Sequence, residues 1–173
     1  KFGKRETCNA KFFLRVNMKT TRYQKIFITG ALGFVGRALA ECYRAFGAEA
    51  CGLDVRADSA LNIVAGDVSK PEAWQSAMDG CDLVIHTAAI VTNNVAREEA
   101  WRVNVLGARR VLDAAIRARA KRFLHISSLA AMRFNVEDRA DESAPVMPTG
   151  NPYVDTKIAS EHVVLAAHAK GEI

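Results

Sequence analysis

Length and composition restrict this 173-residue chain to one domain with a hydrophobic core, since half of its residues are apolar and a quarter are charged. The formal net charge is +5, but residues 1–17 alone carry a net charge of +4. The hypothesis of nucleic-acid binding therefore loses its main support, and no stretch reaches the roughly 20 apolar residues of a membrane span. The four cysteines lack metal-ligand spacing, so we expect free thiols, no metal site and a cytoplasmic location.

Residues 1–17, with the sequence KFGKRETCNAKFFLRVN, show no sustained periodicity and no apolar run long enough for the core of a signal peptide. The first residue is not methionine, whereas Met18 opens a stretch that leads directly into an apolar run. We therefore expect the folded domain to span residues 18–173. Residues 1–17 are interpreted either as sequence from outside the native protein or as a disordered extension.

Short apolar runs alternate with longer segments of helical periodicity from residue 25 onward. Buried strands are predicted at 25–29, 48–54, 61–67, 82–89 and 122–128. Helices are predicted at 37–47, 72–78, 97–119 and 152–169. Near-continuous apolar strands that alternate with helices are typical of a parallel sheet covered on both faces. The pattern predicts a doubly wound α/β fold of the Rossmann type.

The segment TGALGFVG places Gly30, Gly33 and Gly36 between the first strand and the first helix. The pyrophosphate of a dinucleotide needs exposed backbone N–H groups at a helix N-terminus and no side chain that blocks close approach. Glycines also serve ordinary tight turns, but the position between strand and helix favours a cofactor.

Carboxylates end the second and third strands. Asp54 follows Gly30 by 24 residues, where it can accept hydrogen bonds from both ribose hydroxyls and would repel a 2′-phosphate. This position favours NAD over NADP, although Arg56 keeps NADP as the alternative. Asp67 lies where a carboxylate meets the adenine amino group, or it serves equally well as a helix cap or turn residue.

Two further motifs follow the fifth strand. Ser127 and Ser128 lie at the carboxyl edge where doubly wound sheets bind ligands, although serine is also a common turn former. Tyr153 and Lys157 share one face of the last helix, so that the ammonium lowers the pKa of the phenol toward working pH. Alone, such a pair is more often a coincidence on a surface.

The ordered combination of these motifs resembles the extended branch of the short-chain dehydrogenase/reductase superfamily, which contains sugar-nucleotide epimerases, dehydratases and 3β-hydroxysteroid dehydrogenases. The signature T-G-x-x-G-[FY]-x-G is met from Thr29 to Gly36, and Y-x-x-x-K is met by Tyr153 and Lys157. The segments HTAA (86–89), NVLG (104–107) and DESAPVMP (141–148) are similar to further motifs of that branch. The resemblance covers residues 25–170.

The resemblance implies a role for each matching residue. Tyr153 is the general acid/base, Lys157 holds the nicotinamide ribose and tunes Tyr153, and Ser128 binds the substrate oxygen. Asn104 supports the catalytic site. The cofactor-binding set predicted from the motifs and the resemblance is Gly30, Gly33, Phe34, Val35, Gly36, Asp54, Asp67, Val68, Thr87, Ala88, Ala89 and Lys157. His86 and His125, in strands that lead to the site, are interpreted as packed structural residues.

The resemblance favours an NAD-dependent dehydrogenase that oxidises a hydrophobic or steroid-like alcohol, because VIHTAAIV and HISSLAAM look closest to 3β-hydroxysteroid dehydrogenases. A sugar-nucleotide epimerase or dehydratase is the alternative, and an NAD-binding fragment or sensor without turnover is the third hypothesis. Family members are substantially longer, which implies a Rossmann domain truncated before its later strands and C-terminal substrate domain. The resemblance also implies a possible homodimer through the helix that carries Tyr153.

Overall fold

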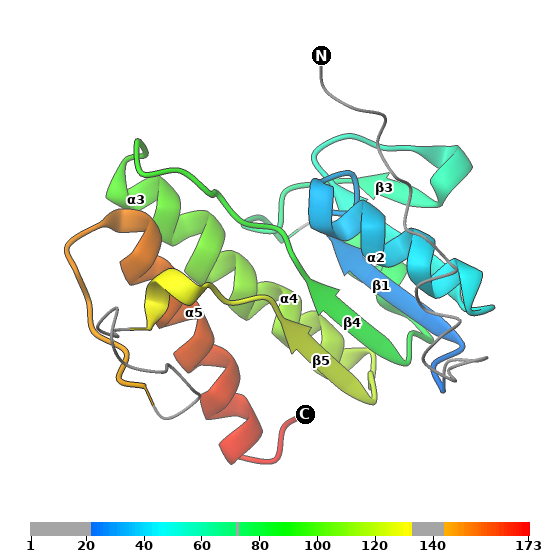
Figure 1. Ribbon diagram of the computed structural model, residues 1–173. Coiled ribbons are helices and arrows are strands. Elements are labelled where there is room, and N and C mark those ends of the chain that lie inside the picture. Colours follow the sequence, from blue (N-terminus) through cyan, green and yellow to red (C-terminus); the bar gives the residue numbers. More distant parts are fainter. Residues whose placement is uncertain (1–21, 72, 133–143) are drawn as a thin grey trace, which may run out of the picture.

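The computed structural model describes residues 22–71, 73–132 and 144–173 (Figure 1). Residues 1–17 and part of the DESAPVMP segment lie outside these ranges. Within the described residues, five parallel strands form one sheet in the order β3-β2-β1-β4-β5. The strands are β1 (Lys25–Thr29), β2 (Glu49–Asp54), β3 (Ile63–Ala65), β4 (Leu83–His86) and β5 (Arg122–His125).

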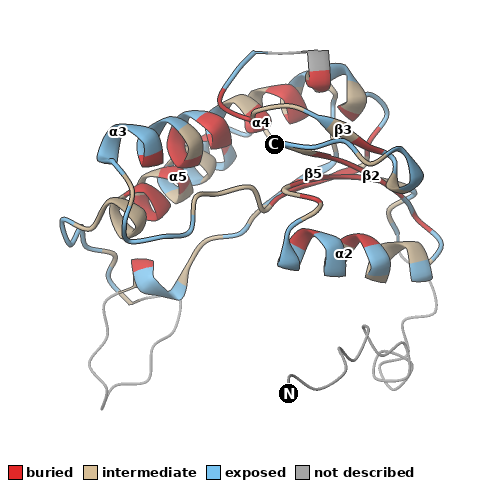
Figure 2. Ribbon diagram, turned by 90° about the horizontal axis from the view of Figure 1, so that it is seen from above, coloured by how far each residue is buried: buried red, intermediate tan, exposed pale blue. Residues whose placement is uncertain are grey.

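Helices cover both faces of the sheet, which confirms the doubly wound fold. Helix α2 (Phe34–Ala45) packs on one face, and α4 (Gly107–Arg117) and α5 (Pro152–Ala169) pack on the other (Figure 2). The short helix α3 (Arg97–Ala100) and the π-helical segment η3 (Trp101–Leu106) precede α4. The 3₁₀ segments are η1 (Ser59–Leu61), η2 (Ala73–Met78) and η4 (Leu129–Ala131).

The core follows from the alternation of side chains along the strands. Ile26 and Ile28 point toward α2, whereas Phe27 packs with Val111 and Leu112 of α4 on the opposite face. All five side chains are fully buried, and each contributes roughly 1.5–3 kcal/mol through burial. The hydrophobic core therefore lies on both faces of the sheet.

Three strands end earlier than their apolar runs predict. β4 stops at His86 and β5 at His125, although both runs continue for three more residues. The N–H of Ala88 donates to the side chain of Thr29 at 3.3 Å, so the chain leaves the ladder at this point. The residues beyond the strand ends form loops at the carboxyl edge of the sheet.

The predicted helix 97–119 is divided by the π-helical segment η3 and ends at Arg117. Arg119, placed at the end of the apolar stripe, has the left-handed φ of 56°. The predicted helix 37–47 instead begins at Phe34, because Gly33 is the extended N-cap residue. Local periodicity located these helices correctly and their boundaries only approximately.

Two glycines in the turn between β1 and α2 allow backbones to approach closely. Gly30 has φ +68°, and a Cβ there would lie 2.9 Å from the backbone nitrogen of Ala88. A Cβ on Gly36 would lie 2.2 Å from the carbonyl oxygen of Gly30. Any larger residue must move the turn away from β4 or push α2 off the sheet.

Gly36→Ala should therefore lower the free energy of unfolding by roughly 1–3 kcal/mol, as overpacking does. An ordinary helical glycine shows the opposite sign, because alanine favours the helix by about 1 kcal/mol. Urea denaturation of the variant measures the change, with Arg37→Ala, an exposed neighbour on the same helix, as the control. A stabilised Gly36→Ala variant would contradict the close packing of the turn.

Candidate functional site

A cavity of about 560 Å³ opens at the carboxyl edge of the sheet, between the loops that follow β1, β2, β3 and β4. Apart from Lys157, every cofactor-binding residue predicted from the sequence lines it. The predicted lining residues are Gly30, Gly33, Phe34, Val35, Gly36, Asp54, Asp67, Val68, Thr87, Ala88 and Ala89. Sequence reasoning missed Leu53, Val55, Gly66, Ile90, Val91, Arg102 and Val103. Most of these residues adjoin predicted ones in the sequence, so proximity along the chain could have identified them. We call this cavity the nucleotide cleft.

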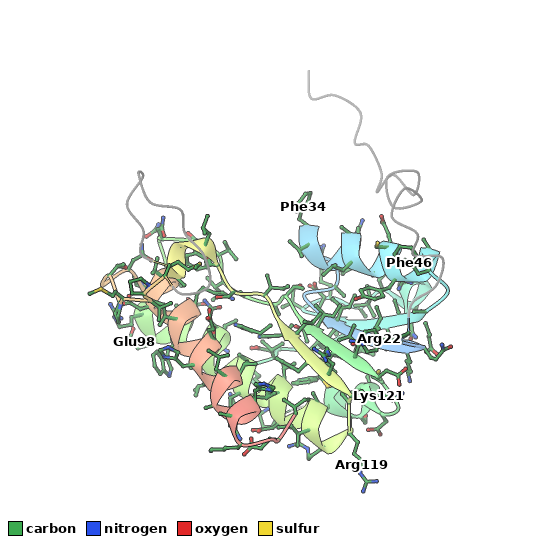
Figure 3. All side chains as sticks on the ribbon, turned by 60° about the horizontal axis from the view of Figure 1, so that its bottom comes forward. Arg22, Phe34, Phe46, Glu98, Arg119 and Lys121 are labelled. Atoms are coloured by element: carbon green, nitrogen blue, oxygen red, sulfur yellow. The ribbon has the colours of Figure 1, made fainter. Side chains whose placement is uncertain are left out.

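The glycine turn gives the nucleotide cleft an open helix N-terminus. The amides of the first helical turn have no acceptor within the helix, and they carry its positive dipole end. The side chain of Phe34 is 94% exposed and projects away from the body of the molecule (Figure 3). A phosphate can therefore reach these amides, and a Cβ on Gly36 would disturb the turn beside them.

Asp54 is held in a defined orientation at the end of β2. One carboxylate oxygen accepts the N–H of Leu32 at 2.9 Å, and the other accepts the N–H of Val55 at 2.8 Å. Each oxygen keeps a further lone pair, and the residue lines the nucleotide cleft. This geometry fits a carboxylate that receives hydrogen bonds from ribose hydroxyls.

Asp67 is a turn residue that also pairs with an arginine. Its carboxylate accepts the backbone N–H of Ser69 at 2.8 Å and the hydroxyl of Ser69 at 2.7 Å, and it forms an ion pair with Arg102 at 3.1 Å. Burial raises the pKa of Asp67, but the hydrogen bonds from Ser69 and Arg102 outweigh it and lower the pKa overall. The pair joins the loop after β3 to η3 across the cleft.

Tyr153 and Lys157 lie in the first two turns of α5. The side chain of Asn151 caps this helix and accepts the N–H of Tyr153 at 2.9 Å. Lys157 is 4% exposed, and its ammonium donates to the carbonyl oxygen of Ile126 at 2.5 Å. Burial lowers the pKa of Lys157 to about 8, although nearby Glu161 raises it. The charged end of Lys157 therefore lies at the end of β5.

Ser128 follows β5 by three residues and caps the short segment η4. Its hydroxyl oxygen accepts the N–H of Ala130 at 3.2 Å, and the residue is half-buried. The neighbouring hydroxyl of Ser127 donates to Glu161 of α5. The structure thus brings the end of β5 and the helix that carries Tyr153 and Lys157 together.

Asn104 connects the nucleotide cleft to α5. It lies in η3, 2% exposed, and accepts the N–H of Ile90 at 2.8 Å while donating to the carbonyl of Ile90 at 3.1 Å. It also donates to the hydroxyl of Thr156 at 3.0 Å. These three bonds fix the loop after β4 against α5, and support of the site by Asn104 stays a prediction.

Asn104→Asp should lower the free energy of unfolding by about 2–4 kcal/mol, because a buried carboxylate oxygen would replace the donor to Ile90 and Thr156. Thermal and chemical denaturation measure this loss. Asn94→Asp makes the same chemical change at an exposed position and should have little effect. Equal stability of the two variants would contradict the bonding assigned to Asn104.

Three comparisons with known proteins agree with this geometry. The family model for the NAD dependent epimerase/dehydratase family matches residues 26–173. Sterol demethylase protein B of Methylococcus capsulatus is 32% identical over 154 residues, which are 83% of this chain and 47% of that protein. A 3 beta-hydroxysteroid dehydrogenase/Delta 5-->4-isomerase of Mycobacterium tuberculosis is 30% identical over 161 residues, 85% of this chain and 44% of that protein.

Among solved structures, a short-chain dehydrogenase/reductase superfamily protein from Agrobacterium tumefaciens with bound NAD superposes with a TM-score of 0.77. It is 30% identical and covers 87% of this chain, which spans 47% of that one. The chain therefore spans about half the length of the relatives that it matches. Because the family model matches nearly all of the described fold, this chain belongs to the NAD-dependent epimerase/dehydratase family.

Proposed function

We propose that this chain is the cofactor-binding and acid–base part of an NAD-dependent oxidoreductase similar to the 3β-hydroxysteroid dehydrogenases. The observation that carries the proposal is the nucleotide cleft joined through Asn104 to the helix bearing Tyr153 and Lys157. The cofactor supplies the hydride acceptor at C4 of its nicotinamide ring. Each residue of the chain then has a defined task around the substrate oxygen.

In alcohol oxidation, the hydroxyl of Ser128 donates a hydrogen bond to the substrate oxygen and orients it. Tyr153, as phenolate, accepts the hydroxyl proton while the carbon-bound hydrogen leaves with its electron pair as hydride. Lys157, four residues after Tyr153 on the same helix, holds the nicotinamide ribose beside the substrate. The same groups run in reverse when a carbonyl is reduced, with Tyr153 returning the proton.

An apolar cavity of about 530 Å³ supports a hydrophobic substrate. It lies between the segment that follows Ser128 and the segment that precedes Tyr153. Its lining consists of Leu129, Ala130, Ala131, Met132, Met147, Pro148 and Thr149. These side chains offer no charge to a phosphate, so they favour a steroid-like alcohol over a nucleotide sugar. A sugar-nucleotide epimerase or dehydratase remains the alternative, distinguished by turnover without net NADH.

We further propose a homodimer and a cytoplasmic location. Trp101 and Leu106 on η3 and Leu165 on α5 are large apolar side chains that stay exposed, as a helix-pair interface would require. Cys51 and Cys81 are free thiols, which fits a reducing compartment. No helix among the described residues has the length and apolar character needed to cross a bilayer. Sedimentation of the chain measures its oligomeric state and so tests the proposed homodimer.

Tyr153→Phe should reduce turnover by roughly 10²–10⁴-fold, the usual contribution of a general acid/base, while NADH affinity stays almost unchanged. Absorbance of NADH formed from a hydroxysteroid and fluorescence titration with NADH provide the two measurements. Tyr43→Phe, a phenol on α2 outside the cleft, is the control and should keep full turnover. Retained activity in Tyr153→Phe would refute the catalytic assignment, and NADH binding without any turnover in the unsubstituted protein would indicate a non-catalytic cofactor-binding protein.

Asp54→Ala should weaken NAD binding by at least about 10-fold relative to NADP, since the lost hydrogen bonds involve a charged acceptor. The ratio of the two dissociation constants cancels any general damage to the cleft. Asp79→Ala removes an exposed carboxylate away from the cleft and should leave the ratio as in the wild type. An unchanged ratio in Asp54→Ala would contradict the preference for NAD.

A further inference from the structure

Three polar residues end three neighbouring strands side by side. Thr29 is the register partner of His86, and His86 is the register partner of His125. Register partners in adjacent strands point to the same face of a sheet, here the face that α4 and α5 cover. Together with Ser160 of α5 they form what we call the histidine row: Thr29, His86, His125 and Ser160.

Hydrogen bonds run along the histidine row from both ends. The Thr29 hydroxyl lies 2.7 Å from Nδ1 of His86, and it also accepts the N–H of Ala88 at 3.3 Å. Ser160 donates to the carbonyl of Lys157 at 2.9 Å and lies 3.1 Å from Nε2 of His125, so it accepts the proton of that nitrogen. The bond to Ser160 thus assigns the Nε2–H tautomer to His125.

The two imidazoles stack on one another with ring centroids 5.5 Å apart and an angle of 24° between their planes. His86 is 1% exposed, and His125 is half-buried. Within the described residues, Nε2 of His86 and Nδ1 of His125 have no hydrogen-bond partner. Apolar side chains would fill this space at a lower desolvation cost. Packing alone therefore does not explain the histidine row.

Charges around the row indicate its role. Burial lowers the pKa of His86 well below its ordinary value, as do His125 and Lys157. Burial and then Lys157 lower the pKa of His125 to about 4. The charged or titratable groups near Lys157 are His125 on β5, His86 on β4, and Tyr153 and Glu161 on its own helix. A proton on either imidazole would repel the ammonium of Lys157 in a site of low dielectric constant.

We propose that His125 is a positioning residue for Lys157: through Ser160 it holds the turn of α5 that carries this lysine, and its uncharged ring, stacked on that of His86, places no positive charge beside the ammonium. The inference rests on the proposed role of Lys157 at the cofactor ribose. Ser160 follows Lys157 by three residues and bonds to its carbonyl, so a displaced Ser160 moves the backbone of Lys157 directly. A polar neutral neighbour also solvates the ammonium better than an apolar one.

The pH dependence of NADH affinity tests the proposal in the chain itself. Fluorescence titration between about pH 6 and pH 10 should show that NADH affinity falls near pH 8, where Lys157 loses its proton. We call this fall in affinity the basic limb. His125→Leu removes the bond to Ser160 and the polar neighbour, so its basic limb should move down by about one pH unit. His125→Gln keeps a donor near Nε2 without a titratable ring, and it should restore the wild-type limb.

Two further variants make each outcome decisive. Ser160→Ala should shift the limb in the direction of His125→Leu, and it remains informative if the leucine variant does not fold. His162→Leu changes an exposed histidine on the same helix and should leave the limb in place. An unmoved limb in folded His125→Leu or Ser160→Ala, or an equal shift in His125→Gln, would overturn the positioning role. Lys157→Met separates the two proposals, because a limb that persists in it refutes the role of Lys157 itself.

Discussion

The carboxamide of Asn104 is the contact on which the arrangement of the site depends, because it joins segments that the sheet alone leaves separate. It bonds to both backbone groups of Ile90 beyond β4 and to the hydroxyl of Thr156 on α5. Thr156 immediately precedes Lys157, so one buried side chain sets the spacing between the loop that borders the cleft and the helix that carries Tyr153 and Lys157. Breaking any one of these bonds would leave a polar group buried without a hydrogen-bond partner. This cost keeps the contact between Asn104, Ile90 and Thr156 rigid.

Much of the fold could be predicted because local pattern and final packing agree. The apolar runs became five parallel strands, and the glycine turn of Thr29–Gly36 lies where strand and helix periodicity meet. The failures have a common cause in tertiary contacts. The predicted strands at 82–89 and 122–128 extend past β4 and β5 because the residues that follow form loops at the carboxyl edge, and sequence pattern alone does not separate a strand from such a loop. The π-helical break at η3 coincides with the side-chain bonds of Asn104, for which helical periodicity has no signal.

The nucleotide cleft was more predictable than its chemistry. Glycines and a carboxylate at strand ends are visible as sequence spacing, and Asp54 has the expected geometry. Asp67 shows the limit of such reasoning, since both of the roles open to it are compatible with its position at the end of a strand. Its bonds to Ser69 fulfil the turn role, and its ion pair with Arg102 adds a partner 35 residues away. No spacing rule indicates that pair, because it depends on where η3 crosses the cleft.

Lys157 shows that the site is maintained at the expense of stability. Its pKa is about 8 in the folded chain against about 10.4 in an unfolded one, so between these pH values the unfolded chain binds more protons. The free energy of unfolding therefore rises with pH through this window, and at neutral pH the buried ammonium lowers it. The carbonyl of Ile126 and the charge of Glu161 each reduce this cost without removing it. A buried charge surrounded by partners that keep it protonated is typical of a functional site, and packing alone would favour an apolar side chain there.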